Sequence, residues 1–141
     1  MKFVYPYDLE PDEGLACVSF PDVPEALTSA DPSSEAFEST VHDCLIAALG
    51  FYIQERDPLP RPSAAKGRKV VTLDALESAK LALYSAMKAQ RVTNVALAER
   101  LGVTENVIRR LLDLDHRSHI GQVESALKTL GQRLAISVKA A

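Results

Sequence analysis

Polar side chains that can hydrogen-bond to nucleic-acid bases lie close together between residues 104 and 110. A carboxylate can accept from cytosine, an amide can bind adenine through two hydrogen bonds, and a guanidinium can bind guanine in the same way. In a helix whose N-cap is Thr104, Asn106 and Arg110 are one turn apart and share a face. An Asn at the start of a preceding helix could hold a phosphate. The candidate DNA-binding residues are Asn94, Thr104, Glu105, Asn106, Arg109 and Arg110.

The apolar residues around them follow the pattern of a helix-turn-helix motif. Gly102 can adopt the backbone conformation of a tight turn, and Ala98 is small enough for a second helix to cross close to it. Val103, Ile108 and Leu111 are expected to hold the second helix against the first. The pattern is completed by Leu97 and Leu101. We favour DNA binding over the alternative, a small helical bundle whose surface is simply polar.

Motifs for catalysis or metal binding are not found in the sequence, which has no nucleophile–base pairing, Gly-rich phosphate loop or metal-ligand spacing. His42 is expected on a helix surface, while His116 and His119 could contact phosphates or serve a loop. We therefore expect no catalytic residues, no metal and no cofactor. A cluster of acids could imitate a metal-nuclease site, although most are expected in turns: Asp8, Glu10, Asp12, Glu13 and Asp22.

Charge is divided unevenly along the chain. Residues 1–62 have three cations against twelve acids, a net charge of −9, and residues 63–141 have thirteen cations against seven acids, a net charge of +6. Such an asymmetry indicates two modules with partners of opposite charge. The basic half suits DNA and the acidic half suits a basic partner.

Composition and length place the chain among globular proteins, with 141 residues, 47% of them hydrophobic and 25% charged. Apolar runs stay well short of the ~18 residues of a membrane span, and the N-terminus does not resemble a signal peptide. Cys17 and Cys44 are too few for a disulfide framework and are expected to be buried free thiols. We expect a cytoplasmic protein without membrane contact.

A small antiparallel sheet followed by a helix is predicted for the N-terminal part. Ala16, Val18 and Phe20 alternate onto one face of a strand, and Gly14 can take a positive φ in the turn before it. A helix is expected to begin at Asp31-Pro32, with one face on the sheet, and to end before the prolines at 58, 60 and 62. The three predicted strands lie near residues 3–7, 15–20 and 26–30.

A segment rich in Pro, Ser, Lys and Arg follows, and it predicts a linker. We expect a first domain over residues 1–62, a linker over residues 63–69 and a second domain over residues 70–141. If Val70-Val71 adds a strand to the sheet, the first domain extends to about residue 72.

The second domain is predicted to be helical with one terminal strand, so the fold class is α+β. Asp74 and Glu77 have capping-box spacing, and further helix starts are expected at Thr93, Thr104 and Ser118. The alternation from Leu134 to Val138 predicts a strand, which is stable only when paired. Pairing across the two-fold axis of a homodimer would serve this need, since helix-turn-helix proteins usually bind two half-sites.

The N-terminal part resembles the HicB family of antitoxins, from HicA–HicB toxin–antitoxin systems. The C-terminal part is similar to the lambda-repressor-like helix-turn-helix domains that one branch of the family carries. Many members have Gly-Cys where this chain has Glu25-Ala26, and the repressor-like helix usually starts with Gln rather than Asn94. The resemblance is carried by Leu9-Glu10-Pro11-Asp12-Glu13-Gly14, Val18-Ser19-Phe20-Pro21-Asp22-Val23-Pro24 and Asp31-Pro32-Ser33-Ser34-Glu35-Ala36.

The resemblance implies a degenerate ribonuclease-H-like N-terminal domain that is not an enzyme. It also implies a small, basic, HicA-like toxin as partner, which cleaves mRNA with a histidine and is masked by the antitoxin. The DNA-binding half would repress its own operon as a homodimer or higher oligomer. Two other functions stay open: a stand-alone repressor whose N-terminal domain senses a ligand, and a metal-dependent nuclease.

Overall fold

The computed structural model describes residues 2–141, and the chain divides between Leu73 and Asp74 into two compact units. The first unit therefore includes residues 63–69, where the sequence analysis expected a linker. Its end lies close to the alternative boundary at about residue 72. Each unit has its own core and is described by itself.

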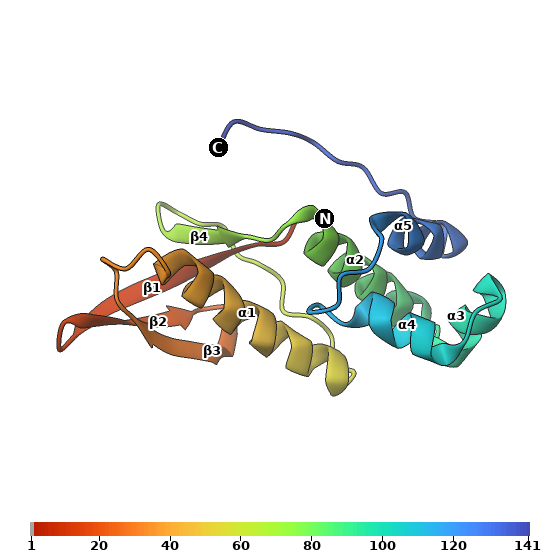
Figure 1. Cartoon of the computed structure of the whole chain (residues 1–141), viewed down its shortest axis with the longest axis horizontal. Coiled ribbons are helices and arrows are strands. Elements are labelled where there is room, and N and C mark those ends of the chain that lie inside the picture. The colour runs from red at the N-terminus through yellow and green to blue at the C-terminus, as the bar shows by residue number, and fades with distance from the viewer. Residues whose placement is uncertain (1) are drawn as a thin grey trace. The chain divides into compact units, whose positions relative to one another are not determined.

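A four-stranded antiparallel sheet forms the first unit, in the order β3-β2-β1-β4 (Figure 1). Glu13 and Gly14 both have positive φ, which suits the two-residue turn that joins the first two strands. Val71 pairs with Tyr5 and Val70 with Pro6, so these two valines do add a strand to the sheet. The strands are β1 (Val4–Asp12), β2 (Leu15–Phe20), β3 (Val23–Ala30) and β4 (Lys69–Thr72).

The long helix α1 (Phe37–Gln54) covers one face of this sheet (Figure 1). The predicted alternation in β2 is confirmed, because Ala16, Val18 and Phe20 are all buried. They share this core with the buried residues Val41, Leu45 and Leu49 of α1. The alternate positions of β2, beginning with Leu15, belong to the opposite face of the sheet.

The predicted start of this helix at Asp31-Pro32 is wrong, since α1 begins five residues later at Phe37. The Asp31 carboxylate accepts hydrogen bonds from the Ser33 backbone N–H at 2.9 Å and from the Ser33 hydroxyl at 2.7 Å. The Ser34 hydroxyl then accepts from the Ala36 N–H at 3.1 Å. These local bonds hold the segment in turns, a competition with helix that is typical of Asp and Ser.

The segment between α1 and β4 is bonded to the sheet at three places. The Tyr5 hydroxyl donates to the Pro60 carbonyl at 2.8 Å, and the Ser63 N–H donates to the Asp22 carboxylate at 2.8 Å. Arg68 pairs with Asp8, with Nε 3.3 Å from Oδ1. The segment is therefore a constituent of the first unit.

Four helices form the second unit, with a core centred on Leu81, Leu83, Leu97, Ile108 and Val123. The capping box before the first helix is confirmed, because the Glu77 N–H donates to the Asp74 carboxylate at 2.7 Å and the Asp74 N–H donates to Glu77 at 3.2 Å. The helices are α2 (Ala75–Gln90), α3 (Asn94–Leu101), α4 (Glu105–Leu112) and α5 (Ile120–Thr129).

The predicted terminal strand from Leu134 to Val138 is wrong for the single chain, because residues 132–141 have no regular secondary structure. A strand needs the backbone of a neighbour to satisfy its N–H and C=O groups. Among the alternating apolar side chains, Leu134 is half-buried, while Ile136 is 65% exposed and Val138 is 94% exposed.

Candidate functional site

The turn between α3 and α4 has the form that the sequence predicts. Gly102 has a φ of 67°, the left-handed conformation that a residue without Cβ adopts at low cost. The Val103 N–H donates to the Ala98 carbonyl at 3.0 Å and closes the end of α3. Ala98 is buried, as is Leu97 beside it. Thr93 caps the start of α3 by accepting from the Ala96 N–H at 3.1 Å.

Three apolar side chains of α4, those of Ile108, Leu111 and Leu112, are buried and fix the rotation of the helix. The expectation that Val103 also holds the helix down is wrong, because Val103 lies in the turn itself and is 38% exposed. Thr104 occupies the N-cap position in extended backbone, but its hydroxyl makes no capping hydrogen bond.

The face of α4 opposite its buried apolar side chains carries the predicted polar residues. Asn106, Arg109 and Arg110 are exposed, and Glu105 is half-buried. Arg109 donates from Nε to the Glu105 carboxylate at 2.8 Å, so these two side chains form a pair. Asn106 and Arg110, one turn apart, present an amide and a guanidinium side by side. Such a pair of groups can hydrogen-bond to base edges.

A buried lysine that was not predicted from the sequence binds the C-terminal end of this helix. Lys80 of α2 is fully buried, and its ammonium donates to the Arg110 carbonyl at 2.8 Å and to the Asp113 carbonyl at 2.7 Å. It also donates to the Ser118 hydroxyl at 2.9 Å. These three acceptors match the three donors of an ammonium group.

The arrangement supplies what the end of α4 lacks. Asp113, its C-cap, is in extended backbone with a ψ of 112°, so the helix has no left-handed cap to satisfy its last carbonyls. Lys80 satisfies two carbonyls there and places a positive charge at the negative end of the helix dipole. Burial lowers the pKa of the ammonium, while the nearby Asp113 acts in the opposite direction. A sequence signal existed, since Lys80 lies one turn from Leu76 and Leu83 on the apolar side of α2.

The loop between α4 and α5 is tied to the same network. Ser118, predicted to start a helix, is not the N-cap of α5, which is His119. The Ser118 hydroxyl instead donates to the Arg110 carbonyl at 3.2 Å and lies 2.9 Å from Nδ1 of His116. His116 is thus engaged within the loop, as one of the two alternatives proposed for it.

Charge remains divided when it is counted by structural unit. Residues 1–73 contain six cations against twelve acids, a net charge of −6, and residues 74–141 contain ten cations against seven acids, a net charge of +3. The difference from the count at residue 62 comes from Lys66, Arg68 and Lys69, which belong to the first unit. The first unit stays acidic and the second basic.

Two features of residues 2–141 bear on other functions. In that part of the chain, no three His, Cys, Asp or Glu side chains gather closely enough to hold a metal ion. None of the helices described there combines the length and apolar character needed to cross a membrane. Cys17 and Cys44 are free thiols, half-buried rather than fully buried as expected.

Comparisons with known proteins relate nearly the whole chain to one family. A family model described as HicB_like antitoxin of bacterial toxin-antitoxin system matches residues 4–82. Antitoxin HicB 2 of Photorhabdus laumondii is 38% identical over 132 residues, which is 94% of each chain. Antitoxin HicB of Pseudomonas fluorescens is 33% identical over all of this chain and 97% of its own. Antitoxin HicB of Escherichia coli K12 is 34% identical over 94% of this chain and 96% of its own.

Replacing Lys80 with Met should destabilise the second unit while keeping its packing volume. We expect a loss of about 1.5–3 kcal/mol in the free energy of unfolding, because the substitution removes the charged donor from the Arg110 and Asp113 carbonyls. Lys128→Met is the matched control, since Lys128 makes an exposed pair with Glu124 at 3.7 Å and such pairs contribute little. Urea unfolding followed by helical circular dichroism measures both. Equal midpoints for the two variants would contradict the role given to Lys80.

Proposed function

The chain belongs to the HicB-like antitoxin family, and we propose that it binds and masks a small, basic toxin of the HicA type. The observation that carries the proposal is the match to antitoxins along almost the full length of the chain. The family resemblance assigns the toxin an mRNA-cleaving activity, so the chain would act as a ribonuclease inhibitor and not as an enzyme.

The acidic first unit supports this proposal. Its net charge of −6 is concentrated in 73 residues, and a basic partner would be attracted to it over a distance set by ionic strength. Charge complementarity accelerates encounter and orients the partners, while close contacts supply the residence time. Salt should therefore slow association more than it affects dissociation.

The full-length protein should protect a reporter RNA from the purified toxin at equimolar ratio. Stopped-flow association with the toxin should slow as salt rises from about 0.05 M to 0.5 M, because the Debye length shortens over this range. The control is an unrelated ribonuclease, which the protein should leave active. Full RNA cleavage in the presence of excess folded protein would contradict the proposal.

We further propose that the second unit represses transcription of its own operon through a helix-turn-helix, with α4 as recognition helix. The exposed Asn106 and Arg110 support base recognition, and the half-buried Asn94 at the start of α3 is suited to a phosphate. Arg109 is held by Glu105, which favours a phosphate contact or a cytosine contact by the pair. The net charge of +3 agrees with a polyanionic partner.

Arg110→Ala should weaken binding to the operator by about 1–3 kcal/mol while leaving binding to unrelated DNA almost unchanged. The fold should be unaffected, because Lys80 binds the backbone carbonyl of Arg110 and not its side chain. Arg61→Ala, which removes an exposed cation from the first unit, is the control for net charge. Gel-shift titration with both DNAs checks this, and wild-type operator affinity for Arg110→Ala would refute the assignment of that face.

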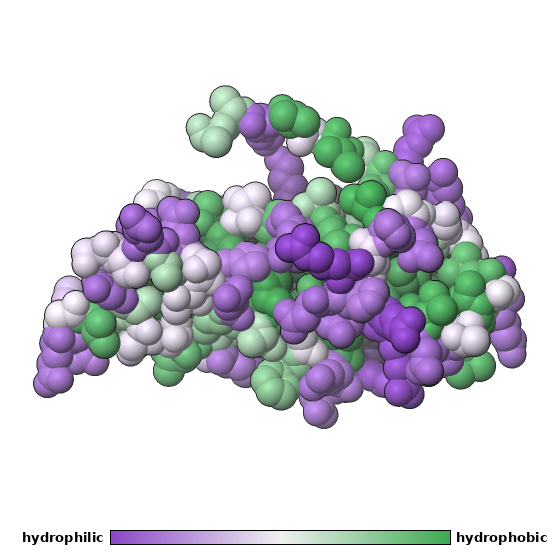
Figure 2. Space-filling view, viewed as in Figure 1, coloured by the Kyte–Doolittle hydropathy of each residue, from purple (hydrophilic) through white to green (hydrophobic). Residues whose placement is uncertain are grey.

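We propose that the protein is a homodimer joined through its C-terminal tail. Leu134, Ile136 and Val138 are spaced as on one face of a strand, and Figure 2 shows hydrophobic residues in green along the tail at the top of the view. Pairing with the same segment of a second copy would satisfy the backbone and bury these side chains. Two half-sites one helical turn apart would then be bound together.

Deletion of residues 132–141 should convert the dimer to a monomer and weaken operator binding, since one half-site would be lost per complex. Light scattering at micromolar concentration measures the mass. Lys139→Ala, an exposed change in the same tail, should leave the dimer intact. A full-length chain that is already monomeric under these conditions would disprove the dimer.

A further inference from the structure

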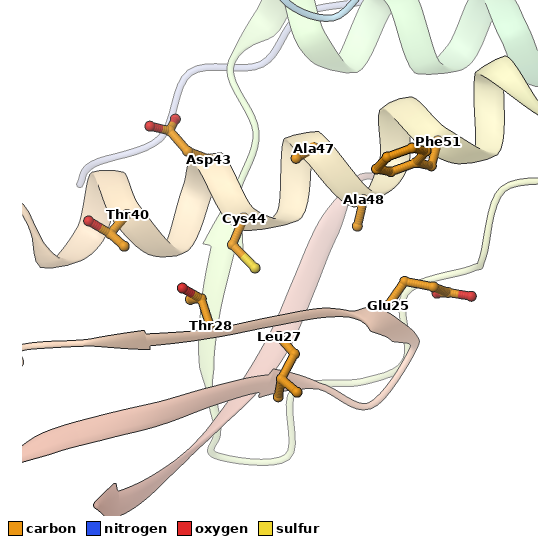
Figure 3. Close-up of a pocket in the computed structure, with 9 residues that line it drawn as sticks. All are labelled: Glu25, Leu27, Thr28, Thr40, Asp43, Cys44, Ala47, Ala48 and Phe51. Atoms are coloured by element: carbon orange, nitrogen blue, oxygen red, sulfur yellow. The ribbon is translucent and has the colours of Figure 1, made fainter. Parts of the chain in front are cut away.

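An open groove of about 410 Å³ runs between α1 and β3 in the first unit (Figure 3). Phe51 of α1 and Glu25 of β3 lie at one end of the groove, and Thr40 and Asp43 of α1 lie at the other. Cys44 of α1 and Thr28 of β3 point toward each other between these ends (Figure 3). The groove is thus neutral in its middle and acidic at both ends.

The most exposed part of the groove is apolar. Phe51 of α1 is 61% exposed, whereas Phe37, Val41, Leu45, Ile46 and Leu49 of the same helix are buried in the core. Ala47, one turn earlier on α1, is also exposed. An aromatic side chain exposed beside a concave surface is the kind of group that anchors a protein interface. Burial of the Phe51 ring by a partner would remove apolar surface from water and thereby stabilise the complex.

Both walls of the groove carry carboxylates and neither lysine nor arginine, and His42 of α1 lies with its Nδ1 3.1 Å from Oδ1 of Asp43. Helix α1 contains Glu38 and Asp43 but no lysine or arginine, and β3 contains Glu25 and likewise neither cation. A cationic side chain entering the groove would therefore meet carboxylates from either element. A second copy of this chain docking through the same face would bring like charges together, which is unfavourable. The charge thus favours a basic partner over self-association.

Glu25 is held in place at its end of the groove. The Tyr52 hydroxyl donates to the Glu25 carboxylate at 2.7 Å, and this hydrogen bond raises the pKa of Tyr52 to about 12. A fixed carboxylate loses less conformational entropy on binding than a free one. Phe51 lies at the same end of the groove, and the two side chains together could bind an arginine. The guanidinium plane would stack on the Phe51 ring, and its N–H groups would donate to the Glu25 carboxylate.

The sheet itself adds a further means of attachment. In the described sheet β3 is an edge strand, since the order is β3-β2-β1-β4. An edge strand has backbone groups that can pair with an extended segment of another protein. A partner lying along β3 could thus place a side chain in the groove while its backbone pairs with the sheet.

We propose that this groove is the docking site for the toxin, which inserts an arginine or lysine side chain between Phe51 and Glu25. The inference rests on the proposed masking of a basic toxin and specifies where on the first unit it occurs. The aliphatic part of the inserted side chain contacts Phe51, and its cation pairs with Glu25. The opposite face of the sheet, which includes Leu15, stays free of the toxin.

The test is calorimetric titration of full-length variants with the purified cognate toxin. Phe51→Ala removes the anchor, and Ala47→Arg fills the groove with a long cation; each should weaken toxin binding by about tenfold or more. Their matched controls are Leu15→Ala, an exposed apolar truncation on the other face, and Ala64→Arg, the same charge change outside the groove. Both controls should bind as wild type.

Glu25→Gln tests the charge separately, because the amide oxygen can still accept from Tyr52. This variant should bind more weakly at low salt and show a smaller loss of affinity as salt rises. Unfolding midpoints equal to wild type confirm that each variant is folded, and Ala47→Arg provides the groove test if Phe51→Ala is not.

The outcomes separate the inference from the function on which it rests. A wild-type protein that does not bind the toxin would refute masking itself, and the groove with it. Tight wild-type binding with unchanged affinity in Phe51→Ala and Ala47→Arg would refute the groove alone. Weakening by Leu15→Ala, but not by the groove variants, would place the toxin on the opposite face of the sheet.

Discussion

The position of α4 depends on one buried charge. Lys80 of α2 donates three hydrogen bonds to the end of α4 and to the loop after it. Helix α3 ends in a left-handed glycine cap, whereas α4 has no such cap and is bound by Lys80 instead. A buried ammonium is unfavourable unless its donors are all satisfied, and here each has an acceptor. The direction in which Asn106 and Arg110 point follows from this contact together with the buried Ile108 and Leu111. Base recognition, as proposed for these residues, thus needs a side chain 30 residues earlier in the chain.

The features that sequence predicted well are those in which one residue determines its own local structure. Gly102 ends a helix because its backbone can be left-handed, and the alternation of Ala16, Val18 and Phe20 sets one face of a strand whatever lies beyond it. Burial of Ile108 followed from helical periodicity in the same way. These residues outlined the sheet and the paired helices α3 and α4.

The predictions that failed depend on partners that spacing does not reveal. Asp31 is a residue type that often caps a helix, yet its carboxylate accepts a hydrogen bond from Ser33, and the helix begins only at Phe37. Ser118 looks like an N-cap but accepts from Lys80, so the next residue takes that position. The groove was not predicted at all, because Glu25 and Phe51 lie on separate elements and meet only when α1 covers the sheet. Long-range contacts of this kind have no local signature.

The hydrogen bonds and the ion pair that connect residues 60–68 to the first unit limit where a fragment of the chain can end. A polypeptide ended at Pro62 would keep the Tyr5–Pro60 bond but lose β4, the strand that pairs with β1 from Val4 to Tyr7. β1 would then be an open edge, with unpaired backbone groups next to apolar side chains. Such edges are templates for aggregation. A version of the acidic half that keeps this edge paired must therefore extend through β4 to Leu73, and so include Lys66, Arg68 and Lys69.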